Sequence, residues 1–270
     1  MKIILASIAL TASTAILACD TPWFNTDTFG RKSLNHLPHG WTLSTDLVFR
    51  GRVSERFEVR PGDCGTDGRW DDCKMDRERS EIFVEKPKIS PGETVFVSWN
   101  VYVPDDFLES NKVRTTLGQI HSRNGPRGFA AGLPSKPPLL QFDVWRGKYQ
   151  MCWHRLSGQD GNIKDECRWF DLKDLGEMKG QWTEIIIELN TDIKKGYAKI
   201  WVDQKLRVDI KEPVATYKPQ FFYVKYGVYR SFVSRQGEPM PTQIVYFDEV
   251  RIGKKFDHVS TTRCNLKPVH

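Results

Sequence analysis

Apolar and polar residues alternate along several stretches of the chain. In residues 94–104, apolar side chains fall on every second position, at Val95, Val97, Trp99, Val101 and Val103. Successive side chains of a strand point to opposite faces, so this pattern predicts a strand with one buried face. The stretches 184–190, 197–210 and 244–253 also predict strands, the second with a tight turn near residues 203 and 204. Helical patterns are short, with one candidate at 171–178.

Many strands without interleaved helices predict an all-β fold. We expect a β-jelly-roll sandwich of two antiparallel sheets, with a concave outer face that forms a substrate groove. The chain has 270 residues and shows no internal repeat, coiled-coil heptad or long linker. Residues 19–270 are therefore expected to form a single domain, in which the Pro- and Gly-rich stretch 124–138 is a mobile loop.

The N-terminus has the pattern of a secretory signal peptide. Lys2 precedes an apolar stretch and Ala18 offers a small residue for cleavage, so residues 1–18 predict export. No later run approaches the roughly 20 apolar residues that a membrane span needs. We expect a secreted or periplasmic protein without a membrane span.

Six cysteines agree with an oxidising compartment, where an even number suggests disulfides. Local pairing is the simplest arrangement, and it leaves one pair to tie the two ends of the chain together. We predict three disulfides: Cys19–Cys264, Cys64–Cys73 and Cys152–Cys167. The alternative is a lipoprotein anchored at Cys19, because "ILAC" is an imperfect lipobox. Zinc binding through Cys152, His154 and Cys167 matches no standard spacing, so no metal site is expected.

The charge of the chain favours an acidic partner. The formal net charge is +6 at pH 7, which suits a polyanionic polysaccharide, a nucleic acid or an anionic surface. The basic residues are scattered rather than clustered, which argues against nucleic acid. Aromatic residues make up 12% of the chain. They can stack on sugars, but a β-sandwich core uses the same residues, and the core is the simpler interpretation.

Three predicted strands carry unusual polar faces. In residues 221–231, Tyr223, Lys225, Gly227 and Tyr229 share one face, and Gly227 is expected to leave room for a close approach to the backbone. The polar face of residues 77–85 carries Arg77, Arg79, Glu81 and Phe83, and that of residues 117–122 carries Gln119 and His121. Each face alone fits a solvated surface, and a lone His is usually structural. The combination of Arg, Gln, His, Lys and Tyr on these faces, in a basic exported protein, favours a catalytic site over a solvated surface.

These residue types suit cleavage of a uronic-acid polymer by β-elimination. A base takes the proton from C5, beside the carboxylate, and the 4-O-glycosidic bond then breaks. Arg, Gln or Lys near the carboxylate stabilise the enolate-like dianion that forms. His, with an ordinary pKa near 6.5, can act as the base. Tyr can protonate the leaving oxygen, or act as the base where neighbouring cations lower its pKa. No cofactor is required for this chemistry.

At these residues the sequence resembles the jelly-roll polysaccharide lyases. It is most similar to the heparin lyase I-like group, which includes glucuronan lyases, over residues 40–255. Alginate lyases of the same fold carry the motifs R-x-E-L, Q-I-H and Y-F-K-A-G-x-Y-x-Q. Here "RSEI" (79–82) matches the first motif with Ile82 in place of Leu, and "QIH" (119–121) matches without change. The stretch "YVKYGVYRS" (223–231) matches the third motif at Tyr223, Lys225, Gly227 and Tyr229, with Tyr226 for Ala and Ser231 for Gln. The departures concern the identity of the substrate more than the mechanism.

The resemblance implies a role for each matching residue. Arg79 and Gln119 would neutralise the carboxylate, His121 would act as base, and Tyr229 would act as acid or as combined acid and base. Lys225 would contact a neighbouring sugar, and Glu81 would orient Arg79. Further substrate contacts are expected from Arg77 and Tyr223.

Two other functions remain open from the sequence. A non-catalytic carbohydrate-binding module on the same fold would need the aromatic and cationic residues but no paired His and Tyr. A glycoside hydrolase would need two carboxylates flanking the bond. Asp143, Glu81 and Asp248 are available, but no close acidic pair lies on one strand face. We expect a monomeric lyase acting on glucuronan, alginate or a heparin-like polymer, and a structural calcium ion is compatible with the sequence.

Overall fold

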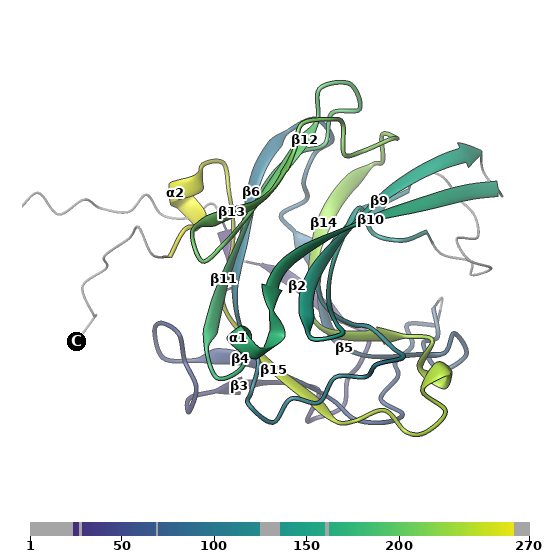
Figure 1. The fold of residues 1–270 in the computed structure, drawn as a ribbon, viewed down its shortest axis with the longest axis vertical. Helices are drawn as coiled ribbons and strands as arrows, with labels where there is room; N and C mark the ends of the chain where they lie inside the picture. Colours follow the sequence, from purple (N-terminus) through teal and green to yellow (C-terminus); the bar gives the residue numbers. More distant parts are fainter. Residues whose placement is uncertain (1–23, 27–28, 69, 125–135, 160–161, 262–270) are drawn as a thin grey trace, which may run out of the picture.

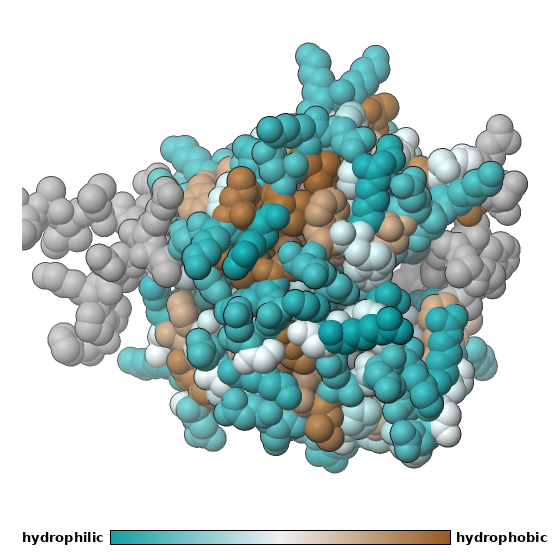
Figure 2. Space-filling model, viewed as in Figure 1, coloured by the Kyte–Doolittle hydropathy of each residue, from teal (hydrophilic) through white to brown (hydrophobic). Residues whose placement is uncertain are grey.

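Two antiparallel β-sheets packed face to face build the molecule, which confirms the predicted jelly-roll sandwich (Figure 1). The computed structural model describes residues 24–26, 29–68, 70–124, 136–159 and 162–261. The predicted signal peptide, most of the predicted mobile loop and the Cys19–Cys264 pair lie outside the described residues. No helix in the described ranges is long and apolar enough to cross a membrane. The face in view in Figure 2 is mostly polar, with smaller apolar patches between the charged side chains.

The first sheet has eight strands, and its central strands are those that the alternating pattern predicted. In spatial order they are β13 (Lys205–Ile210), β12 (Tyr197–Val202), β11 (Trp182–Asn190), β6 (Thr94–Tyr102), β15 (Gln243–Gly253), β4 (Ser54–Val59) and β3 (Trp41–Ser44), with β1 (Phe24–Asn25) also paired to β15. Asp203 and Gln204 have φ angles of 48° and 66°. The predicted tight turn therefore joins β12 to β13.

The second sheet has seven strands and carries the groove. Its order is β10 (Asn162–Asp174), β9 (Lys148–Gln159), β8 (Leu140–Trp145), β7 (Thr115–Arg123), β14 (Phe221–Ser231), β5 (Arg77–Lys86) and β2 (Gly30–Ser33). In the described ranges, helix is confined to α1 (Leu175–Met178), α2 (Phe256–Val259) and the 3₁₀ turn η1 (Val233–Gln236). Of the stretch 171–178 that was expected to be helical, only the second half forms a helix, because residues 171–174 continue β10.

The core lies between the sheets and uses the apolar side of each strand. The five alternating residues of the β6 region, Val95 to Val103, are each at most 3% exposed. The Trp99 ring meets the Phe142 ring of the opposite sheet edge-on, with centroids 5.1 Å apart. The apolar residues on the other side of β14 are fully buried, among them Phe222, Val224 and Tyr226. Burial of this side turns the polar side of β14 outward.

Gly227 was expected to leave room for a close approach to the backbone, but in the structure it serves the packing of β14. It has a φ of 127°, and a Cβ placed there would lie 2.4 Å from the Ser80 carbonyl oxygen and 2.9 Å from the Phe57 ring. The pairing of β14 with β7 also shifts register between Tyr226 and Tyr229, which marks a β-bulge. The glycine therefore allows close packing of β14 against β5 and the core, and does not open space in the groove.

Two of the three predicted disulfides are present in the described part of the chain. Cys64–Cys73 closes a loop just before β5, and Cys152–Cys167 joins β9 to β10, with Cα–Cα distances of 5.2 and 5.6 Å. Both pairings confirm the local scheme. The first of these loops proves important for the site, because it delivers a carboxylate to Arg79.

Candidate active site

A groove of about 1000 Å³ runs over the outer face of the seven-stranded sheet. The predicted site residues come from three adjacent strands, β5, β7 and β14, and all eight line this groove: Arg77, Arg79, Glu81, Gln119, His121, Tyr223, Lys225 and Tyr229. The strand register explains their meeting, because Lys225 pairs with Gln119 and Tyr229 pairs with both Thr116 and Arg79. Side chains of paired residues lie on the same face of a sheet.

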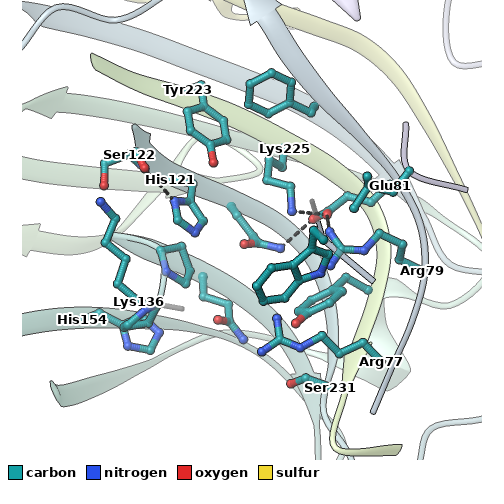
Figure 3. A pocket seen from close by; sticks show the side chains of 18 of the residues that line it. Arg77, Arg79, Glu81, His121, Ser122, Lys136, His154, Tyr223, Lys225 and Ser231 are labelled. Atoms are coloured by element: carbon teal, nitrogen blue, oxygen red, sulfur yellow. Dashed lines mark hydrogen bonds and ion pairs between the residues drawn. The ribbon is translucent and has the colours of Figure 1, made fainter. Parts of the chain in front are cut away.

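Glu81 lies at the centre of a charged cluster (Figure 3). Its carboxylate accepts hydrogen bonds from Gln119 Nε2 at 2.6 Å and from Arg79 Nη1 at 3.1 Å, and it forms an ion pair with Lys225. Burial lowers the pKa of Lys225 to about 8, against the opposing attraction of Glu81. The predicted contact between Glu81 and Arg79 is present. With three donors on one carboxylate, Glu81 also fixes the positions of Gln119 and Lys225.

Asp72 is a site residue that sequence reasoning missed. It is fully buried, and its two oxygens accept hydrogen bonds from Arg79 Nε and from Nη2, the latter at 2.7 Å. Trp70 Nε1 donates to the same carboxylate at 2.8 Å. The acidic residues beside Cys73 were the only signal in the sequence, and nothing there shows which of Asp71 and Asp72 points inward. Asp72 and Glu81 together hold three of the five N–H groups of Arg79.

Tyr229 is surrounded by cations. The guanidinium carbon of Arg79 lies 4.6 Å from the ring centroid, Lys225 Nζ lies 5.6 Å away, and the guanidinium carbon of Arg77 lies 5.9 Å away. Tyr229 is 8% exposed, and burial raises the pKa of its hydroxyl, while Arg77 and Arg79 act in the opposite direction. The cations therefore favour a phenolate that burial alone would strongly disfavour.

His121 is held as a neutral ring in one tautomer. Its Nδ1 lies 2.7 Å from the Ser122 backbone nitrogen and 3.2 Å from the Ser122 carbonyl oxygen. In the shorter contact the backbone N–H donates to Nδ1, which puts the proton of the neutral ring on Nε2. The ring stacks on Tyr223, with centroids 5.3 Å apart and planes 10° apart. Burial, reinforced by Lys225 and Lys136, lowers the pKa of His121 to about 3. Figure 3 shows the second ring nitrogen directed away from Ser122, so in this tautomer it offers a donor.

The carboxylates do not form the pair that a glycoside hydrolase uses. Asp248 lies on β15 in the other sheet, where it accepts the backbone N–H groups of Phe49 and Arg50. Asp143 does line the groove, but it is fully buried and accepts hydrogen bonds from Thr116 and Gln141. Both oxygens of Glu81 are occupied by donors. In the described part of the chain, the acidic residues named from the sequence thus give no pair of accessible carboxylates facing one position in the groove.

The "CWH" segment lies at the groove wall beside Cys167. Cys152, His154 and Cys167 place one ligand atom each within 4.8 Å of one another. The two sulfur atoms are joined as the disulfide, which leaves His154 Nδ1 to hydrogen-bond Asp165 at 2.8 Å. In this oxidised form the sulfurs are not thiolate ligands.

Comparisons with known proteins bear on the family and the fold of this chain. A family model described as polysaccharide lyase matches residues 24–251. No curated protein sequence matches significantly.

Among solved structures, endo-β-1,4-glucuronan lyase from the fungus Trichoderma reesei is similar, with a TM-score of 0.69 and 15% identity. That comparison covers 88% of this chain and 98% of the fungal one. Alginate lyase AlgAT5 of polysaccharide lyase family 7 gives a TM-score of 0.53 at 13% identity, covering 80% of this chain and 82% of its own. A variant of alginate lyase A1-II′ gives 0.53 at 18%, covering 81% and 84%.

At these identities the structural likenesses establish the fold, whereas the family match extends over nearly all of the described residues. The groove on the seven-stranded sheet lies within that match, together with the three strands that carry its charged centre. The chain belongs to the polysaccharide lyase family.

Proposed function

We propose that this polysaccharide lyase is exported and cleaves glucuronan, a polymer of glucuronate, by β-elimination at the 4-O-glycosidic bond. The two disulfides support an oxidising compartment. The positive net charge supports a polyanionic substrate. The choice of glucuronan over alginate is supported by the higher TM-score to the glucuronan lyase, 0.69 against 0.53.

The reaction needs one proton to leave C5 and one to reach O4. A base takes the C5 proton, the C–H electron pair forms the C4–C5 double bond, and the C4–O4 bond breaks. The leaving O4 takes a proton and becomes the new chain end. In glucuronate the C5 proton and O4 lie on the same side of the ring, so a single group can accept the first proton and deliver it to O4.

Tyr229 is that group in the proposed mechanism. As a phenolate it accepts the C5 proton, and as the resulting phenol it protonates O4 and returns to its starting state. Arg79, whose N–H groups are directed at Asp72 and Glu81, stabilises the phenolate by its charge at 4.6 Å from the ring centroid. This cation-surrounded Tyr229 is the single observation that carries the proposal.

His121 serves as a donor in this mechanism. The Nε2–H tautomer donates a hydrogen bond to the substrate carboxylate, with Gln119 beside it on the same strand. Such donors stabilise the dianion more than the ground state, because negative charge builds up on the carboxylate as the C5 proton leaves. The sequence-based alternative, in which His121 is the base, would require the ring to move its proton to Nδ1 and break the bond from Ser122.

A panel of polymers tests the proposal. Glucuronan, polymannuronate, polyguluronate and heparin are incubated with the enzyme, and the ultraviolet absorbance of the unsaturated uronate is followed. We expect the fastest rise on glucuronan and none with Tyr229→Phe. New reducing ends without the absorbance would indicate hydrolysis. Binding of uronate polymers without either signal would indicate a carbohydrate-binding module, and each of these results would refute the proposal.

A further inference from the structure

A second cationic cluster lies in the groove, away from the charged centre. Arg114, just before β7, lies between two indole rings, with its guanidinium carbon 4.5 Å from the Trp169 centroid and 4.7 Å from the Trp145 centroid. Arg146 lies over the same Trp145 ring at 5.0 Å. We call these residues, with Arg235 of η1, the Arg114 cluster. Arg114, Trp169 and Arg235 line the groove.

The positive charge of the Arg114 cluster is only partly offset within the described part of the chain. None of Arg114, Arg146 and Arg235 has an ion pair there, whereas Arg155 and Arg168 on the neighbouring hairpin share Glu166 and Glu212. Burial lowers the pKa of Arg114, attraction to the Asp143 carboxylate raises it, and repulsion from Arg146 and Arg235 lowers it again. The single Asp143 carboxylate accepts hydrogen bonds from Thr116 and Gln141, so the three guanidinium groups keep an excess of positive charge, which favours binding of an anion.

The clamp gives Arg114 a fixed direction. An exposed arginine normally samples many rotamers, but contact with both the Trp145 and the Trp169 ring restricts the positions that the guanidinium group can take. The edge of a stacked guanidinium still presents its N–H fork, which matches the two oxygens of a carboxylate. Trp169 is 39% exposed, so the clamp itself is accessible from the groove.

The Arg114 cluster lies toward the Tyr229 end of the charged centre. Arg114 precedes Thr116 by two positions, about 7 Å at the usual rise per strand residue, and Thr116 pairs with Tyr229 on β14. Gln119, which in the proposed mechanism lies beside the carboxylate of the reacting sugar, is three positions further along β7. The cluster is therefore suited to a different unit of the same polymer chain.

We propose that the Arg114 cluster is a carboxylate-binding subsite, which takes a uronate unit next to the reacting sugar, on the Tyr229 side of the charged centre. The subsite rests on the proposed function for the identity of the polymer. It makes affinity depend on chain length, because only chains that span both places gain the second contact. Arg114 supplies the fork, and Arg146 and Arg235 add charge.

Equilibrium binding of size-fractionated glucuronan oligosaccharides tests the subsite. The Tyr229→Phe protein serves as the background so that the ligands stay intact, and calorimetry measures the affinities. We expect Arg114→Gln to weaken binding of long oligosaccharides by about tenfold, the size of one charge-assisted hydrogen bond. The shortest oligosaccharide that binds should be unaffected, and carboxyl-reduced chains should not distinguish Arg114→Gln from its parent.

Arg168→Gln is the matched control. It removes the same charge from a β10 residue next to Trp169, but one already paired with Glu166 and Glu212, and should leave all affinities unchanged. Equal weakening for short and long chains, or no weakening by Arg114→Gln, would overturn the subsite. Chains that bind in this length-dependent way but are not cleaved by the wild type would refute the proposed reaction alone. Cleavage with unchanged affinity in Arg114→Gln would refute the subsite alone.

Discussion

Replacement of Asp72 by Asn tests whether the disulfide-bonded loop positions the catalytic centre. The carboxylate is fully buried and holds Arg79 through two hydrogen bonds, with a third from Trp70 Nε1. Asn keeps one acceptor but turns its amide N–H₂ toward a guanidinium N–H, so at least one charge-assisted hydrogen bond is lost. Removing a whole partner from a buried ion pair costs about 3–5 kcal/mol. Because one bond to Arg79 survives, we expect Asp72→Asn to lose about 2–4 kcal/mol.

The functional consequence follows from the place of Arg79 against Tyr229. When Glu81 is the one carboxylate left to hold Arg79, the charge of Arg79 is less well fixed beside the ring, so the phenolate is less stabilised. We expect kcat to fall at least about tenfold. Because Arg79 opposes the rise in the pKa of Tyr229, we also expect the ionisation of Tyr229 in the pH–rate profile to move to higher pH. Urea unfolding gives the stability, and initial rates over pH give the activity.

Asp71→Asn is the matched control, because Asp71 lies in the same loop but is partly exposed and pairs with Lys74. It should leave both the unfolding midpoint and kcat unchanged. Asp72→Asn with an unchanged midpoint would contradict the energetic reasoning. A lowered midpoint with unchanged kcat and pH profile, measured where the variant is fully folded, would show that Asp72 is structural only.

Three further predictions follow from the site. Tyr229→Phe should lower kcat at least about a hundredfold while polymer affinity is retained, and full activity of this variant would disprove the proposed role. Because the pKa of His121 is about 3, the pH profile of kcat/KM, which reports the free enzyme, should show no His121 ionisation near 6.5 and should keep its shape in His121→Asn. An acid limb near 6.5 that disappears in this variant would identify His121 as the base. Added salt should raise KM on the polymer with a smaller effect on kcat, and a salt-independent KM would argue against an electropositive groove.

The strands were predictable because their signal is local. Burial of one face imposes alternation on any half-buried strand, and the run from Val95 to Val103 shows it without knowledge of the partner strands. The turn at Asp203 and Gln204 and the two short-range disulfides are local in the same sense. The polar faces of β5, β7 and β14 could likewise be predicted from the period of two, and all eight site residues predicted from them line the groove.

What the sequence by itself determined was therefore which side chains share a face, and the tertiary structure decided which of them touch. Contacts such as Asp72 with Arg79 depend on how the disulfide loop folds over the sheet. The function of Gly227 depends on a bulge and on the nearness of Ser80 and Phe57. The tautomer of His121 depends on a single bond from Ser122. The alternation of apolar and polar residues does not determine loop paths, strand register or the direction of hydrogen bonds, because these arise only when distant segments pack together.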